Sequence, residues 1–223
     1  MFEIVISLKD GVVSSEARKA PIPEPAEDEV CVKVVATDSN PKDWKVILLL
    51  WHERFTLKYL IESKVYDFKL GDCVAAFHKM TEPAGSYADY AIALSTTTFF
   101  LPSHISFEPG ATLPLATMTA ALAIYQGLKL PTPWNPAPRG QKLPVLIQGG
   151  SSTVGAYALK FSKLSGPSPI ITVAGSGIDF AQSLKAAGYI VDYQKGNVAA
   201  DIQEDSGEAG RETAPCLRCH LRT

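Results

Sequence analysis

The sequence predicts an α/β protein with a β-rich first part and a second part in which strands and helices alternate. Short strand patterns separated by turn residues fill the chain up to about residue 100, which is typical of a small barrel or sandwich. After residue 143, apolar runs of strand length alternate with amphipathic helical stretches, which favours a parallel, doubly wound sheet. We therefore expect two domains that meet between residues 105 and 106.

Four strand patterns support the β-rich part. Residues 2–8 are apolar and β-branched, residues 30–36 alternate apolar and polar side chains, and two later strands are predicted over residues 73–77 and 87–93. Between them, Ile47, Leu50, Trp51 and Phe55 recur at helical spacing. This pattern predicts a helix within residues 46–66 that interrupts the strand rhythm.

The second part begins with a helical, Ala- and Leu-rich stretch over residues 106–129, followed by a loop with four prolines in residues 130–143. Three strands are then predicted at 144–148, 169–174 and 189–193, with helices at 153–165 and 178–187. Residues 204–223 contain no Phe, Trp, Tyr, Ile or Val. Because such a segment buries little apolar surface, we expect a disordered tail.

The composition excludes several classes of protein. The 223 residues are 46% hydrophobic and 20% charged, and 21 basic against 23 acidic side chains give a net charge of −2, so no strong field attracts nucleic acid. The longest apolar run, residues 46–51, is far shorter than the ~20 residues that span a bilayer. The N-terminus lacks a signal-peptide pattern and four cysteines form no disulfide framework, so we expect a reduced, cytoplasmic protein.

A glycine-rich turn gives the clearest chemical signal. Residues 149–155 read GGSSTVG and lie between the first predicted strand and helix of the second part. In this architecture the pyrophosphate of a dinucleotide binds there, because glycines let the backbone approach the phosphates and the helix N-terminus offers free N–H donors. The spacing departs from strict G-x-G-x-x-G, so a turn that is merely tight is the alternative.

The end of the second predicted strand indicates which dinucleotide would bind. NAD-selective folds place an acid there to hold the ribose 2′-hydroxyl, whereas residues 174–177 read AGSG and the next acid is Asp179. The loop leaves room for a 2′-phosphate on Ser176, which favours NADPH. The alternative is that the lack of an acid at this place says nothing about which dinucleotide binds.

Four motifs in order resemble a known superfamily: NPKDWK at residues 40–45, FKLGD at 68–72, GSYADY at 85–90 and the GGSSTVG turn. Together, over about residues 2–202, these motifs resemble those of medium-chain dehydrogenase/reductases. Their particular residues are similar to those of fungal trans-acting enoyl reductases that partner polyketide synthases. The resemblance implies a GroES-like domain over residues 1–105, a partial Rossmann domain over 106–203, and NADPH in the cleft between them.

The resemblance also implies site residues. The nicotinamide side, the pyrophosphate, the adenosine phosphate and the adenine edge would be bound by Asn40, Pro41, Lys42, Asp43, Trp44, Lys45, Gly149, Gly150, Ser151, Ser152, Thr153, Val154, Gly155, Ser176, Gly177, Ile178, Asp179 and Tyr193. The acyl substrate would border Pro114, Leu115, Ala116, Thr117, Met118, Thr119, Ala120 and Ala121. The implied protein is a monomer that reduces a carrier-bound α,β-unsaturated polyketide and binds neither nucleic acid nor membrane.

Metal chemistry is not expected. Zinc-dependent relatives have a ligand cysteine near the position of Asn40 and a four-cysteine lobe, and this chain has neither. Residues 216–220 match the C-x-x-C-H haem pattern, but the surrounding tail offers no fold to enclose a haem, so we interpret the match as chance. The proton donor is not identified, and Tyr87 and Tyr125 are candidates by residue type alone.

Two departures from the superfamily pattern lead to alternatives. Relatives have a glycine-rich strand between the Asp-Trp-Lys and Lys-x-Gly-Asp motifs, whereas residues 46–66 contain no glycine. The sheet of the relatives also continues, whereas here the pattern predicts an end after the third strand. A shifted reading frame would account for both. The alternatives are a stand-alone quinone or enone reductase, and a truncated, catalytically inactive relative that binds at most a partner or nucleotide.

Overall fold

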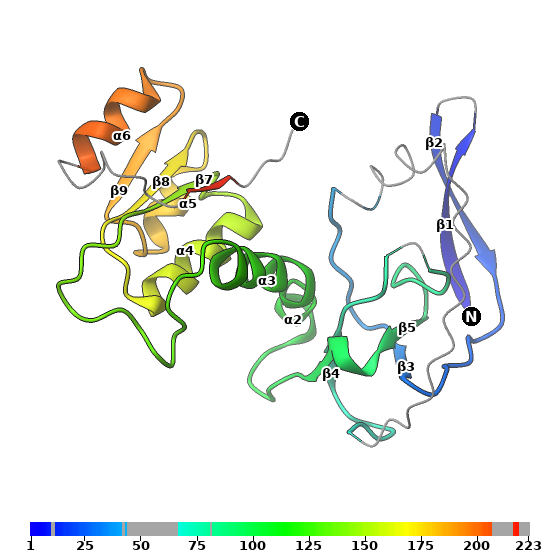
Figure 1. Cartoon of the computed structure of the whole chain (residues 1–223). Helices are drawn as coiled ribbons and strands as arrows, with labels where there is room; N and C mark the ends of the chain where they lie inside the picture. The colour runs from blue at the N-terminus through cyan, green and yellow to red at the C-terminus, as the bar shows by residue number, and fades with distance from the viewer. Residues whose placement is uncertain (10–11, 42, 44–66, 81, 207–215, 219–223) are drawn as a thin grey trace. The chain divides into compact units, whose positions relative to one another are not determined.

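The computed structural model describes residues 1–9, 12–41, 43, 67–80, 82–206 and 216–218 (Figure 1). The chain divides into two compact units, Met1–Pro114 and Leu115–Thr223. The helix predicted within residues 46–66 lies outside the described residues. None of the helices in the described part combines the length and hydrophobicity that crossing a membrane requires.

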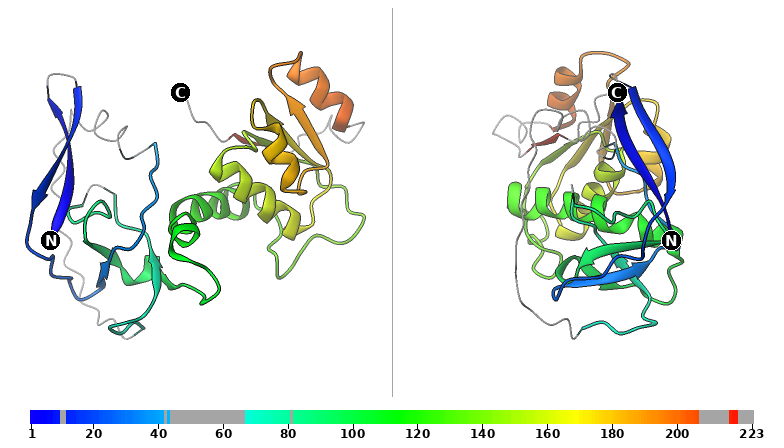
Figure 2. Two further views of the ribbon diagram at one scale, coloured as in Figure 1. Left: turned by 180° about the vertical axis from the view of Figure 1, so that it is seen from behind. Right: turned by 90° about the vertical axis from the view of Figure 1, so that its right-hand side faces the viewer.

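Among the residues that the structure describes, the first unit contains three antiparallel strand pairs. Strands β1 (Phe2–Lys9) and β2 (Val12–Lys19) form a long twisted hairpin in which Phe2 faces Lys19 (Figure 2). The other pairs are β3 with β5 and β4 with β6. Their bounds are Glu29–Lys33, Tyr90–Leu94, Val74–Ala76 and Thr98–Phe100, and the 3-10 helix η2 at Ser95–Thr97 joins β5 to β6. The predicted strands of this part are thus confirmed, while their closure into a GroES-like barrel stays a prediction.

The segment before β5 ties these pairs together through its backbone. The Tyr87 carbonyl accepts the Ile4 N–H at 2.7 Å, and Asp89 bonds to both β1 and the end of β3. Strand β5 is the most buried of the described strands of this unit, because Ala91, Ile92 and Ala93 are all buried. The GSYADY motif is therefore anchored on both sides.

The second unit contains a parallel sheet in the order β10-β7-β8-β9. The bounds of its strands are Val145–Gln148 for β7, Ile170–Ala174 for β8, Tyr189–Asp192 for β9 and Cys216–Arg218 for β10. In the described part of the chain after β6, the helices are α2 (Phe107–Ala111), α3 (Leu113–Ala121), the π-helix η3 (Leu122–Gly127), α4 (Thr153–Ser165), α5 (Ile178–Ser183) and α6 (Val198–Ser206). The predicted alternation of strands and helices is confirmed.

Both faces of the sheet are covered, which explains why its strands read as continuous apolar runs. On one face, Ile147 and Val145 of β7 pack with Leu159 of α4 and Ile124 of η3. The opposite face packs against α6, where Val198 and Ile202 contact Ile171, Val173 and Val191. All five residues of β8 are buried, as expected for a central parallel strand.

The prediction of a disordered tail from residue 204 is wrong for the described residues. Helix α6 continues to Ser206, and β10 pairs in parallel with β7, with Cys216 opposite Leu146. Pairing with the open edge of β7 uses main-chain donors and acceptors, so it does not need the apolar side chains whose absence suggested disorder. The sheet also does not end after its third strand. Because β8 and β10 lie on opposite sides of β7, the strand order reverses at β7.

The division between the units also differs from the predicted boundary. It falls after Pro114 rather than after residue 105, because α2 contacts β4 of the first unit. Helical periodicity alone assigned α2 to the second part. Tertiary contact assigns it to the first.

Candidate functional site

The glycine-rich turn after β7 is held by backbone hydrogen bonds. The N–H groups of Gly149 and Gly150 both donate to the carbonyl of Val173 in β8, at 2.9 and 3.1 Å. Ser152 is the N-cap of α4: its Oγ accepts the N–H of Gly155 at 3.1 Å and donates to the carbonyl of Gly149 at 2.7 Å. The turn is therefore fixed against both the neighbouring strand and the following helix.

Two glycines in this turn have no room for a side chain. A Cβ atom on Gly150 would lie 2.0 Å from Oγ1 of the fully buried Thr172, and a Cβ on Gly155 would lie 2.1 Å from the carbonyl oxygen of Gly149. Thr172 cannot move away easily, because its hydroxyl donates to the Ile147 carbonyl at 2.7 Å. These contacts explain the glycines by close packing of helix, turn and strand.

The first turn of α4 offers unused donors. Among the residues that the structure describes, the N–H groups of Thr153 and Val154 have no hydrogen-bond partner. Free N–H groups and the positive end of the helix dipole favour an anion at this place. The turn lies at the carboxyl ends of the strands, beside β7, where the strand order reverses. Nucleotides bind at this position in open α/β sheets.

The residues predicted for the adenosine end converge on this turn. A Cβ on Gly177 would lie 2.4 Å from the Cβ of Ser151, and a Cβ on Gly175 would lie 2.5 Å from Cζ of Tyr193. The Tyr193 N–H also donates to the Ala174 carbonyl at the end of β8. The turn, the loop after β8 and the tyrosine after β9 therefore form one contiguous surface.

Several side chains of this surface are exposed and can contact a ligand. Tyr193 is 57% exposed, and Ser176 and Asp179 are exposed as well, while Ile178 is half-buried. Asp179 lies in the first turn of α5. The hydroxyl of Ser176 can therefore reach a ligand in this loop.

The loop carrying the NPKDWK motif is described at Asn40, Pro41 and Asp43, while Lys42, Trp44 and Lys45 lie outside the described residues. Oδ2 of Asp43 accepts the backbone N–H of Asn40 at 2.7 Å and the hydroxyl of Tyr87 at 3.1 Å. The Tyr87 hydroxyl oxygen also lies 2.7 Å from Oγ of Ser39. Two motifs far apart in sequence thus share hydrogen bonds.

Tyr87 is a weaker acid than an ordinary tyrosine. Burial raises the pKa of its hydroxyl, the hydrogen bond with Ser39 lowers it, and the carboxylates of Asp43 and Asp38 raise it further. The hydroxyl proton points to Asp43. This geometry does not favour Tyr87 as the proton donor that its residue type suggested.

Tyr125, the other candidate donor, packs in the core of the second unit. Its ring is 5.9 Å from that of Phe161, and its hydroxyl accepts a long hydrogen bond of 3.4 Å from the fully buried Ser165. This environment is that of a structural tyrosine.

The residues predicted to border the substrate, 114–121, all lie on α3. They make up the whole helix except its first residue, Leu113. Ala116 and Ala120 face the core, while Met118 is 58% exposed. The buried hydroxyl of Thr117 has no partner among the described residues. The helix therefore has one packed face and one face that exposes methionine.

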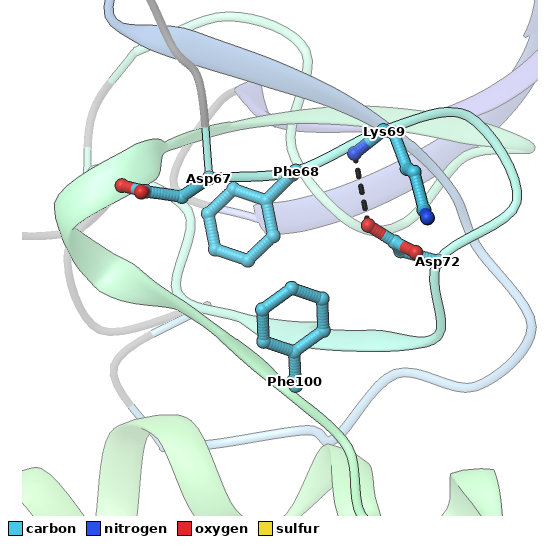
Figure 3. Close-up of a pocket in the computed structure, with 5 residues that line it drawn as sticks. All are labelled: Asp67, Phe68, Lys69, Asp72 and Phe100. Carbon is cyan, nitrogen blue, oxygen red and sulfur yellow. Dashed lines mark hydrogen bonds between the residues drawn. The ribbon is translucent and has the colours of Figure 1, made fainter.

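A separate open pocket lies at the FKLGD turn of the first unit (Figure 3). It has a volume of about 390 Å³ and is lined by Asp67, Phe68, Lys69, Asp72 and Phe100. The rings of Phe68 and Phe100 are 5.1 Å apart, and Oδ2 of Asp72 accepts the N–H of Lys69 at 2.9 Å. Asp72 thus closes a turn, and none of the lining residues is a predicted site residue.

The described residues contain no group of three or more His, Cys, Asp or Glu side chains placed to hold a metal ion. The zinc-independent chemistry stays a prediction. Sequence reasoning missed Ser39 and the partnership of Tyr87 with Asp43. The available signal was that Ser39 adjoins one motif and Tyr87 lies inside another, but their pairing spans 48 residues.

Several solved structures share this fold. Quinone oxidoreductase of Escherichia coli, in complex with NADPH, matches with a TM-score of 0.69 and 20% identity, over 92% of this chain and 63% of the other. CurK enoyl reductase matches with a TM-score of 0.70 and 20% identity, over 93% of this chain and 64% of the other. No family model matches the sequence.

Sequence relatives specify the group more closely. Trans-enoyl reductase fsr4 of Gibberella fujikuroi is 37% identical over 209 residues, which are 86% of this chain and 62% of the relative. Trans-enoyl reductase eqxC of Fusarium heterosporum is 30% identical over 210 residues, or 88% of this chain and 59% of the relative. These comparisons support the resemblance to medium-chain dehydrogenase/reductases. In sequence, the chain is similar to fungal trans-enoyl reductases and spans about three fifths of their length.

Proposed function

We propose that this chain is an NADPH-dependent, zinc-independent trans-acting enoyl reductase that reduces a carrier-bound, α,β-unsaturated polyketide made by a polyketide synthase. The observation that carries the proposal is the surface formed by the glycine-rich turn, the loop after β8 and Tyr193. The 37% identity to a trans-enoyl reductase supports the substrate class. The proposal includes a GroES-like barrel for the first unit and a Rossmann arrangement for the second.

The proposed roles of the residues follow their chemistry. The free N–H groups of Thr153 and Val154 would bind the pyrophosphate, and the exposed hydroxyl of Ser176 would bind the 2′-phosphate. Tyr193 would border the adenine. A bound NADPH supplies the hydride for the β-carbon of the enoyl group.

The first unit would contribute the motif at residues 40–45, of which Asn40 and Asp43 would border the nicotinamide. The exposed side of α3, with Met118, would border the acyl chain. An apolar border excludes water from the reacting atoms, and fixed positions for both reactants lower the entropic part of the barrier.

A second candidate is a quinone or small-enone reductase. A chloroplast envelope quinone oxidoreductase homologue of Arabidopsis thaliana is 30% identical over 213 residues, or 89% of this chain and 62% of the relative. Both candidates use the same nucleotide surface, so they differ only in the hydride acceptor.

The test is a titration of residues 1–223 with NADPH, followed by assays with a crotonyl thioester and with benzoquinone at 340 nm. We expect NADPH to bind more tightly than NADH and the thioester to be the better acceptor. Faster reduction of benzoquinone would favour the second candidate. The absence of NADPH binding would contradict both.

A further inference from the structure

We propose that Tyr87 is a positioning residue whose hydroxyl holds the loop at residues 37–41, together with Asp43, in place, so that Asn40 and Asp43 keep the conformation that borders the nicotinamide. The inference rests on the proposed function, because that function gives the loop its role. It assigns Tyr87 no direct part in proton transfer.

The backbone around Tyr87 is fixed by hydrogen bonds to neighbouring strands. Its carbonyl accepts the Ile4 N–H at 2.7 Å, and the Asp89 N–H donates to the Phe2 carbonyl at 3.0 Å. The Phe2 N–H returns a bond to Oδ2 of Asp89 at 2.7 Å, and the Asp89 carbonyl accepts from Val34 at 2.9 Å. The segment that carries the tyrosine is therefore part of the strand framework and not an independent loop.

The loop is attached to this framework by side chains. The Tyr87 hydroxyl donates to Oδ2 of Asp43 at 3.1 Å and, having used its proton there, accepts from Ser39 Oγ at 2.7 Å. A further bond at 2.7 Å joins the Thr37 hydroxyl to Ser86. One aromatic hydroxyl thus holds two points of the loop.

The bond to Asp43 reaches the backbone of the loop. The carboxylate oxygen that accepts from Tyr87 also accepts the Asn40 N–H at 2.7 Å, and the Asp43 N–H returns a bond to the Asn40 carbonyl at 2.9 Å. If the Asp43 carboxylate swings away, the Asn40 N–H loses its acceptor. The position of the carboxylate, and through it the turn at Asn40, therefore depends on Tyr87.

A positioning role also agrees with the acidity of the group. The pKa of Tyr87 is raised by burial, lowered by the bond with Ser39, and raised by the charges of Asp43 and Asp38. A hydroxyl that keeps its proton and directs it to a carboxylate is a poor donor to a substrate carbon. It is well suited to bind a charged acceptor.

The experiment compares Tyr87→Phe with the unmodified protein, and uses Tyr90→Phe in the adjoining strand β5 as the matched control. Hydrogen exchange is measured at the Asn40 amide, which depends on Asp43, and at the Ile92 amide, which donates to Ala84. We expect exchange at Asn40 to accelerate about tenfold, the effect of losing one hydrogen bond. Exchange at Ile92 should stay constant.

Binding supplies the second measurement. NADPH is compared with adenosine 2′,5′-bisphosphate, which lacks the nicotinamide. In Tyr87→Phe we expect the Kd for NADPH to rise about fivefold to tenfold, a hydrogen-bond-sized effect, while the Kd for the bisphosphate is unchanged. Ser39→Ala should act in the same direction but less strongly, because the bond to Asp43 remains.

The outcomes separate this inference from the proposed function. Equal exchange at Asn40 in the variant and the unmodified protein would overturn the inference, and so would equal weakening of both ligands, which indicates a general loss of structure. If the unmodified protein does not bind NADPH, the proposed function fails, and exchange at Asn40 still decides whether Tyr87 holds the loop.

Discussion

The two regions to which we assign nucleotide binding are held in different ways. In the second unit, the turn at residues 149–155 is fixed by main-chain hydrogen bonds to Val173 and by glycines that pack against Thr172. In the first unit, the loop at residues 37–41 and Asp43 are fixed to the neighbouring segment by hydroxyl groups of Tyr87, Ser39 and Thr37. The turn at residues 149–155 should therefore be disturbed by added side-chain volume, whereas the loop of the first unit should be disturbed by the loss of single polar atoms.

The substitution with the largest expected effect is Gly150→Ala. The new methyl group would lie 2.0 Å from Oγ1 of Thr172, which is fully buried and bonded to Ile147. We expect the free energy of unfolding to fall by about 2–3 kcal/mol, as in overpacked cores, and NADPH binding to be lost. Urea denaturation and fluorescence titration measure the two effects.

Gly127→Ala is the matched control for this substitution, because the nearest atom to its new methyl group is 3.8 Å away. It should change the free energy of unfolding by less than ~1 kcal/mol, in the direction of greater stability. If both alanine variants are equally stable, close packing does not explain the glycine at position 150.

The second prediction concerns the choice of nucleotide. Ser176→Asp would place a carboxylate on the exposed loop after β8. We expect NADPH affinity to fall by about 1–3 kcal/mol through repulsion of the 2′-phosphate and loss of a hydrogen bond, while NADH affinity is maintained. Titration with both nucleotides measures the ratio. Equal affinity of the unmodified protein for NADPH and NADH would contradict the proposed preference.

The third prediction tests the cap of α4. Ser152→Ala removes the acceptor for the Gly155 N–H and the donor to the Gly149 carbonyl. A lost N-cap costs about 1 kcal/mol of stability, so urea denaturation should show a decrease of this size. Substitution of the exposed Ser103 by Ala is the control and should leave stability unchanged. A decrease equal in both variants would show that the cap contributes nothing.

The same contrast explains which parts of the structure could be predicted from the sequence. The alternation in residues 30–36 and the apolar runs of β7 and β8 report burial directly, and the glycine-rich turn has a meaning that depends on its flanking strand and helix. These features depend on residues close together in the sequence, so they can be recognised from the sequence alone.

The features that were missed depend on contacts between distant segments. Strand β10 forms because the edge of β7 offers free main-chain groups, which the composition of residues 216–218 does not reveal. Helix α2 belongs to the first unit because it contacts β4. The bond between Ser39 and Tyr87 joins residues 48 positions apart, and no periodic pattern records such a pair.

The prediction with the smallest expected effect tests the electrostatics around Tyr87. The pKa of Tyr87 is raised from the ordinary value of 10.0, and burial is the largest cause. Asp43 and, to a smaller extent, Asp38 also raise it, whereas the hydrogen bond with Ser39 lowers it. A raised pKa means that the neutral hydroxyl is stabilised in the folded state, so this contribution to stability is complete below pH 10 and is lost as pH rises through the folded pKa. Asp43→Asn removes both the charge and the ionic acceptor, so we expect the pKa of Tyr87 to fall.

The measurement is an alkaline titration of tyrosine labelled with ¹³C at Cζ, in which Tyr87→Phe identifies the signal of Tyr87. The pKa in Asp43→Asn should stay above that of an ordinary tyrosine, because burial, the largest cause, is unchanged. Asp38→Asn should lower it less, since Asp38 is the weakest contributor. A pKa that rises in Asp43→Asn would mean that the Tyr87 hydroxyl does not donate to this carboxylate. Among the described residues, the bonds of Ser39 and Thr37 would then be the ones that hold the loop at residues 37–41.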